Sequence, residues 1–253
     1  MIAALAVLLG LVFGSFLNVL IQRLPQGESP WRGRSRCPRC GRGVRWIENV
    51  PVISFVLLRG RCAGCRQPIS WRYPVVELSA AALALACLHR FGPDAVGLSY
   101  FAFLAVLLAI AWIDWQHMII PDQLSLGALV LGLLLAVTVL PVGVLHASAG
   151  VAAGAGFVWA VAALYKLLRG VEGMGFGDVK LAGMIGAFLG PVPVLTTIFV
   201  AALLGSLYGA VLLARGNNRQ SKVAFGTFLA AGAALCLFFG DTLAVWYLSL
   251  LQR

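Results

Sequence analysis

The stretch GMGFGDVKL, residues 173–181, places a carboxylate in a glycine-rich hinge between two long apolar runs. Carboxylates are scarce in this chain, which has only nine Asp and Glu among 253 residues. Burying an unpaired carboxylate in hydrocarbon costs several kcal/mol. A turn alone could have used Asn or Ser, so Asp178 is expected to have either a partner or a chemical role.

Apolar runs like those beside the hinge recur along the chain. Hydrophobic residues make up 61% of the sequence and charged residues 11%, and the mean hydropathy is +0.94. A soluble domain is about half apolar and about a quarter charged, so this excess indicates membrane spans. A helix needs about 20 apolar residues to cross a bilayer. The candidate spans are residues 2–21, 75–91, 98–114, 124–141, 146–168, 179–190, 191–214 and 224–251.

These runs predict an all-α integral membrane protein with about eight transmembrane helices. The sixth run is short, and only Gly190, Pro191 and Pro193 mark its boundary with the seventh, so a count of seven is the alternative. With eight spans and the N-terminus outside, only Arg90 and Arg253 of the 19 Lys and Arg lie on the outer side. Basic residues are retained in the cytoplasm. The predicted cytosolic segments are therefore 22–74, 115–123, 167–178 and 215–223.

The net charge of +10 is then mainly a signal of topology, and no nucleic-acid partner is expected.

Only the loop 22–74 is large enough to fold alone, and it holds two C-x-x-C knuckles separated by 21 residues. Four thiolates at about this spacing can meet one zinc ion tetrahedrally. The predicted metal ligands are Cys37, Cys40, Cys62 and Cys65.

Two other interpretations of the knuckles remain open. Disulfides could form between the four cysteines, although the cytosol is reducing. Neighbouring arginines favour thiolates, which would suit a redox role as well as a metal. A loop of this size has little core, so a structural zinc ion would contribute much of its folding energy.

Three aspartates lie at helix ends on the predicted cytosolic side. Asp114 ends the third span, Asp122 follows Pro121 where the fourth begins, and Asp178 precedes the sixth. Asp122 is expected to be a helix N-cap, and Asp178 could be one too. Asp114 has no such explanation, because a helix C-terminus disfavours an anion.

Two carboxylates that share a proton can activate water and protonate a leaving amine, as peptide hydrolysis requires. A proton-coupled transporter with an intramembrane carboxylate relay is the rival interpretation. A third possibility is a binding module in which the cytosolic domain acts alone. His117 by itself makes no catalytic triad.

The segments GMGFGDVKL and AWIDWQHMIIPD (residues 111–122) resemble the two signature motifs of the bacterial type IV prepilin leader peptidase/N-methyltransferase family, which belongs to the GxGD class of intramembrane aspartic proteases. Residues 14–25 and 48–78 resemble the opening and the cytosolic domain of that family. The resemblance implies that Asp114 and Asp178 are the catalytic pair.

By the same resemblance, the chain cleaves the leader of prepilins or pseudopilins after a glycine, at the cytoplasmic face of the bacterial inner membrane. It would then N-methylate the new terminal residue with S-adenosylmethionine. No motif in the sequence identifies the residues that bind this methyl donor. A peptidase without the methyltransferase is the alternative.

The organisation that the resemblance implies is a first transmembrane helix at 1–21, a zinc-ribbon-like domain at 22–74 linked to methyl transfer, and a peptidase domain at 75–253. One departure is VAFGTFLA (residues 223–230), where relatives more often have a proline before the FG.

Helix position also suggests different roles for the two acids. Asp178 lies near unpaired backbone N–H groups and Lys180, whereas Asp114 lies at the unfavourable end of a helix dipole. We therefore expect the shared proton to reside mainly on Asp114 and Asp178 to act as the base.

Overall fold

The computed structural model describes residues 1–31, 33, 35–171, 173–215 and 224–251, with side chains up to residue 240. Within these residues the chain is mostly α-helical and has no β-strand, only two isolated β-bridges. It divides into two compact units, Met1–Ala109 and Ile110–Arg253.

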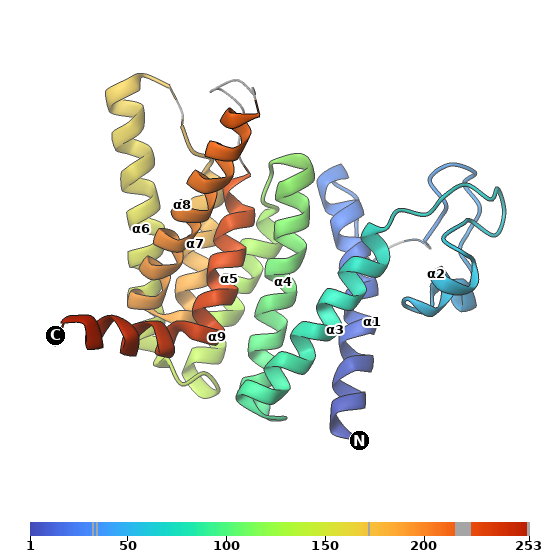
Figure 1. The fold of residues 1–253 in the computed structure, drawn as a ribbon, viewed down its shortest axis with the longest axis horizontal. Helices are drawn as coiled ribbons and strands as arrows, with labels where there is room; N and C mark the ends of the chain where they lie inside the picture. The colour runs from blue at the N-terminus through green and yellow to red at the C-terminus, as the bar shows by residue number, and fades with distance from the viewer. Residues whose placement is uncertain (32, 34, 172, 216–223, 252–253) are drawn as a thin grey trace. The chain divides into compact units, whose positions relative to one another are not determined.

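The first unit is a helix pair with a small irregular domain between its members. Helix α1 packs against α3, and both lie beside the loop that carries α2 (Figure 1). Their close approach depends on glycine, because a Cβ on Gly10 would lie 2.5 Å from Cα of Ala81 and one on Gly14 2.6 Å from Cα of Glu77. The elements are α1 (Ile2–Arg23), η1 (Leu24–Gln26), η2 (Trp46–Asn49), α2 (Ile53–Leu57), α3 (Arg72–Phe91) and the first part of α4 (Ala95–His117).

The second unit is a helix bundle arranged around α7. Helix α7 packs against four other helices, α5, α6, α8 and α9, and its residues 181–188 are all buried. Glycines on two helices permit this packing, because Gly150 on α6 lies directly against the backbone of Gly186 on α7. Besides the end of α4, the unit contains α5 (Asp122–Thr138), α6 (Gly143–Arg169), α7 (Phe176–Leu189), α8 (Pro191–Ala214) and α9 (Phe225–Leu251).

Each of the eight predicted spans coincides with a helix, but the predicted number of crossings is not confirmed. Five helices in the described part of the chain are long and apolar enough to cross a membrane, namely α1 with η1, α3, α4, α6 and α8. Helix α5 has 17 residues and α7 only 14. Fourteen residues rise about 21 Å, which is less than the ~30 Å of a bilayer core.

Candidate active site and metal centre

Asp114 lies in the last turn of α4 and is almost completely buried, with 5% of its surface exposed. Its Oδ2 atom accepts a hydrogen bond of 2.8 Å from the backbone N–H of Thr227. The Thr227 hydroxyl lies 3.3 Å from the same oxygen and 3.1 Å from the carbonyl oxygen of Ala111, so its single proton serves one of these acceptors at a time. Thr227 is the third residue of α9, and the carboxylate therefore faces the N-terminus of that helix.

This partner of Asp114 was not predicted from the sequence. The first N–H groups of a helix have no intrahelical acceptor and form its positive end, so α9 compensates for the unfavourable end of α4. Gly226 makes the approach possible, because a Cβ there would lie 3.0 Å from Oδ2 of Asp114. The only signal in the sequence was the small Gly-Thr pair where the last apolar run begins.

Asp178 lies in the first turn of α7, whose N-cap is Gly175. Its carboxyl group interacts electrostatically with that of Asp114, so the fold brings the two predicted catalytic residues near one another. Ile120 packs at the same place, since a Cβ on Gly177 would lie 3.1 Å from its Cβ and one on Gly226 would lie 2.8 Å from its Cδ1. The glycine hinge thus allows three segments to converge.

Asp122 is not the helix N-cap that the sequence suggested. Pro121 occupies that position, and no side chain caps α5. The Asp122 carboxylate instead forms an ion pair of 2.6 Å with the ammonium group of Lys180, which also lies 5.2 Å from the ring centroid of Phe176. Lys180 therefore binds a different aspartate from the one that its sequence position suggested.

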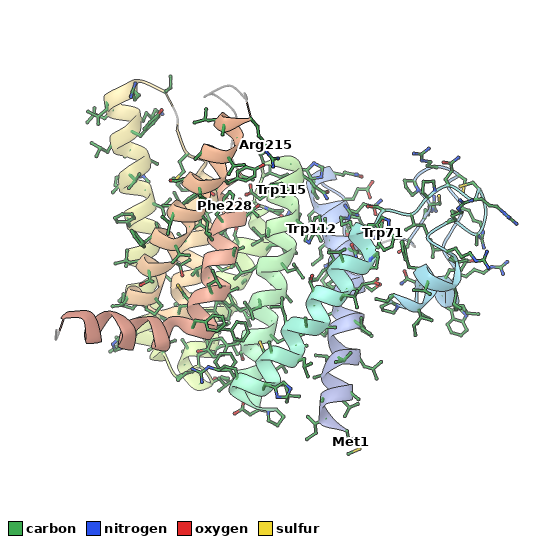
Figure 2. All side chains as sticks on the ribbon, viewed as in Figure 1. Met1, Trp71, Trp112, Trp115, Arg215 and Phe228 are labelled. Carbon is green, nitrogen blue, oxygen red and sulfur yellow. The ribbon has the colours of Figure 1, made fainter. Side chains whose placement is uncertain are left out.

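Three aromatic rings pack beside the buried end of α4. Tyr208 on α8 lies between Trp115 and Phe228, with ring centroids 5.6 Å apart in both pairs. Trp115 directly follows Asp114, and Phe228 directly follows Thr227. Trp115 and Phe228 lie close together in Figure 2. The rings thus join α4, α8 and α9 next to the hydrogen bond between Asp114 and Thr227.

The four predicted metal ligands come together in the first unit. The Sγ atoms of Cys37, Cys40, Cys62 and Cys65 all lie within 4.8 Å of one another, and those of Cys37 and Cys65 are 3.9 Å apart. Tetrahedral zinc with Zn–S bonds of about 2.3 Å would place its sulfurs about 3.8 Å apart. The cluster therefore fits a metal ion such as zinc.

Both knuckles have the same backbone arrangement. The N–H of Cys37 donates to the carbonyl of Arg42, and the N–H of Cys62 donates to that of Gln67, each over 2.9 Å. Within the first turn, the backbone N–H groups of Cys40 and Arg39 lower the pKa of Cys37 to about 6. The N–H groups of Cys65 and Gly64 likewise lower the pKa of Cys62. Burial and the neighbouring thiols instead raise the pKa of Cys65 to about 11. None of the four cysteines of the loop forms a disulfide, so their sulfur atoms are available as metal ligands.

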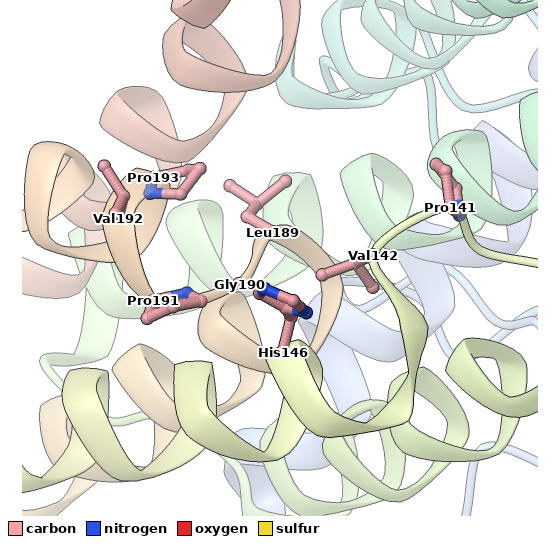
Figure 3. A pocket seen from close by; sticks show the side chains of 8 residues that line it. All are labelled: Pro141, Val142, His146, Leu189, Gly190, Pro191, Val192 and Pro193. Carbon is pink, nitrogen blue, oxygen red and sulfur yellow. The ribbon is translucent and has the colours of Figure 1, made fainter.

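A pocket of about 370 Å³ lies at the other helix ends of the second unit (Figure 3). It is lined by residues where α5 ends, where α6 begins and where α7 gives way to α8, among them Pro141, His146 and Gly190. Its one titratable side chain is His146. The pocket is therefore separate from the aspartates, which lie where α4 ends and α7 begins.

The fold and the site define a helical membrane protein that has a carboxylate pair at converging helix ends and a separate four-thiol cluster. The chain belongs to the type IV leader peptidase family. Residues 101–210 match the family described by that name, and residues 8–91 match the bacterial peptidase A24 N-terminal domain.

Relatives from several bacteria carry the name prepilin leader peptidase/N-methyltransferase. The protein from Burkholderia pseudomallei strain 1026b is 41% identical over 94% of this chain and 85% of the relative. The Aeromonas hydrophila protein is 37% identical over 97% and 93% of the two chains. The Pseudomonas aeruginosa protein is 36% identical over 96% and 92%. No solved structure matches the chain.

Proposed function

We propose that this chain removes the leader peptide of type IV prepilins or pseudopilins and then N-methylates the new N-terminus. Relatives with this paired activity in their name cover nearly the whole chain. The observation that carries the peptidase assignment is the convergence of Asp178 with Asp114, whose oxygen accepts a hydrogen bond from Thr227.

The contacts of Asp114 support a division of roles opposite to the one expected from helix position. The backbone N–H of Thr227 stabilises a negative charge on Asp114. Burial and the nearby charge of Asp114 both disfavour a negative charge on Asp178, which interacts with the backbone of Gly175. In this mechanism the pair shares one proton, which resides on Asp178. Asp114 draws a proton from water as the water attacks the scissile carbonyl, and Asp178 donates a hydrogen bond to the carbonyl oxygen. The proton gained by Asp114 then passes to the leaving amine.

The four-cysteine loop has a different role in this proposal. Zinc held by Cys37, Cys40, Cys62 and Cys65 joins the two knuckles and stabilises the domain 22–74, whose proposed function is in methyl transfer. S-adenosylmethionine supplies the methyl group. The transmembrane domain 75–253 carries the peptidase, so the two activities belong to different parts of the chain.

We place the protein in the bacterial inner membrane, with the four-cysteine loop and both aspartates on the cytoplasmic side. The apolar helices and the family support the membrane location. The distribution of Lys and Arg supports the orientation.

The experiment that tests this function is incubation of the purified protein in detergent with a pilin-like precursor, with and without S-adenosylmethionine. Mass spectrometry resolves loss of the leader and gain of a methyl group as separate mass changes. Leader loss is expected under both conditions and methylation only with the methyl donor. A proton-coupled transporter would leave the precursor intact in detergent, and a peptidase without methyltransferase activity would never add the methyl group.

A further inference from the structure

The four-cysteine loop carries an exposed apolar surface that no part of the described chain covers. Its side chains come from η2 and α2 and are between 56% and 81% exposed. The two elements form one surface because the Ser54 hydroxyl donates a hydrogen bond of 2.7 Å to the carbonyl of Ile47. Clustered exposed apolar side chains mark a surface for interaction. We call this surface the apolar ridge; it consists of Trp46, Ile47, Ile53, Val56 and Leu57.

Two contacts hold the ridge beside the start of a membrane-capable helix. The backbone N–H of Val52, immediately before α2, donates a 2.7 Å hydrogen bond to the carboxylate of Glu77. Glu77 lies in the second turn of α3. The ring of Phe55 in α2 also packs on Trp71, the residue before α3, at 4.9 Å between centroids. Helix α2 is therefore held against the N-terminal turns of α3.

This attachment has an unusual local structure. Val52 has φ 59° and ψ −49°, a conformation that is a clear outlier for a β-branched residue. Its acceptor, Glu77, is buried with 6% of its surface exposed. A strained backbone persists only where its surroundings hold it, and here the strained residue fixes the position of α2 against α3.

The side chains around the ridge are of the types found at the interface between a lipid bilayer and water. Val75 and Leu78, in the first two turns of α3, are also exposed apolar side chains. Trp46 and Trp71 are both largely exposed, and tryptophan is enriched where membrane and water meet. Helix α3 itself meets the length and hydropathy of a membrane span.

Positive charge lies on both sides of the ridge in the sequence. Arg45 precedes η2, and Arg59 and Arg61 follow α2; all three are exposed. The one acid between these arginines, Glu48, is paired with Arg42 at 2.8 Å. The excess of arginine favours the anionic headgroups of a membrane surface.

We propose that the apolar ridge lies in the headgroup region of the bilayer leaflet at the N-terminal end of α3, with anionic lipid as its partner. This lipid contact would hold the four-cysteine loop against the membrane rather than free in solution. The proposal is independent of which activity the chain carries.

Photo-crosslinking tests what covers the ridge. p-Benzoylphenylalanine replaces Leu57 in the full-length protein, which is placed in nanodiscs of phosphatidylcholine with or without phosphatidylglycerol. The matched control carries the same residue at Ala63, which is exposed between Cys62 and Cys65 and does not belong to the ridge. The midpoint of thermal unfolding, compared with that of the wild type, confirms that both variants are folded.

Mass spectrometry of the adducts then gives the answer. We expect lipid adducts at position 57 but few at position 63, and about fivefold more adducts when phosphatidylglycerol is present. Equal adducts at the two positions, or none at position 57, would overturn the proposal. So would an adduct at position 57 with an added pilin-like precursor in place of lipid, since the ridge would then be a substrate surface.

Discussion

At the scale of single residues, the buried oxygen of Asp114 depends on atoms that lie 113 positions further along the chain. The donor is Thr227, which supplies its backbone N–H and places its hydroxyl within reach. Asp178 instead interacts with the backbone of Gly175 in its own hinge and lies under the electrostatic influence of Asp114. The two carboxylates therefore occupy different surroundings despite their predicted common function.

Asp114→Asn and Asp178→Asn are each expected to reduce cleavage below detection, because an amide can neither take a proton from water nor share one with its partner. Expression and zinc content should stay near the wild-type values. The matched control is Asp122→Asn, which weakens a part-exposed ion pair with Lys180 and should retain most activity. Cleavage assays on purified variants decide this, and full activity in either of the first two would remove the assignment.

Thr227→Val keeps the shape of the side chain and the backbone N–H but removes the hydroxyl. We expect kcat for cleavage to fall about tenfold, with KM nearly unchanged, because a hydrogen bond to a charged group contributes about 1.5–3 kcal/mol. Thr227→Ser should restore kcat. A rise in KM alone, or an equal loss in the serine variant, would assign Thr227 a purely structural role.

At the scale of helices, the glycines that look alike in sequence have different surroundings. A Cβ on Gly186 of α7 would meet the backbone of Gly150 on α6, whereas a Cβ on Gly209 of α8 would have no described atom within 4 Å. Each belongs to a pair of glycines four residues apart, a spacing that permits close packing of helices. The spacing therefore identifies candidates, and the neighbouring helix decides which of them are in contact.

Gly186→Ala should lower the midpoint of thermal unfolding and reduce cleavage, since an added methyl group would force α6 and α7 apart. Overpacking of this kind costs about 1–3 kcal/mol. Gly209→Ala is the control, and it should leave both properties unchanged because the site is open. Thermal unfolding in detergent, followed by tryptophan fluorescence, measures the difference; equal stability of the two variants would contradict the packing described here.

Much of this helical structure was predictable, and the reason is local. Apolar runs interrupted by glycine, proline and charge located all the long helices, and Gly190 correctly separated α7 from α8. Helix ends were less predictable, because α4 continues past Asp114 to His117 and α7 begins before Asp178. The partner of Asp114 and the attachment of α2 to Glu77 could not be predicted, since both depend on contacts between distant segments.

At the scale of the whole molecule, the four-cysteine cluster and the aspartate pair belong to different compact units. The cluster lies in the loop between α1 and α3, whereas the aspartates lie on helices of the second unit. Loss of the metal is therefore expected to affect the two proposed activities unequally.

Serine in place of any one of Cys37, Cys40, Cys62 or Cys65 should lower the zinc bound per chain and destabilise residues 22–74, because a metal ligand is lost. Methylation should fall more than cleavage. Cys87→Ala is the control, as Cys87 is buried in α3 outside the cluster. Zinc analysis and mass spectrometry of the product measure these effects, and purified wild-type protein with disulfides and no metal would refute the zinc assignment.

The shortness of α7 has an electrical consequence. Its 14 residues rise about 21 Å, and beyond its last residue lies the pocket of about 370 Å³. Where water enters that pocket, the insulating layer along α7 is thinner than the surrounding lipid core of ~30 Å. In the proposed membrane orientation, the voltage would fall over a shorter path along α7 than through lipid, so the local field would be stronger there. The two proposed catalytic residues, the buried Asp114 and the part-buried Asp178, would lie at one end of this focused field.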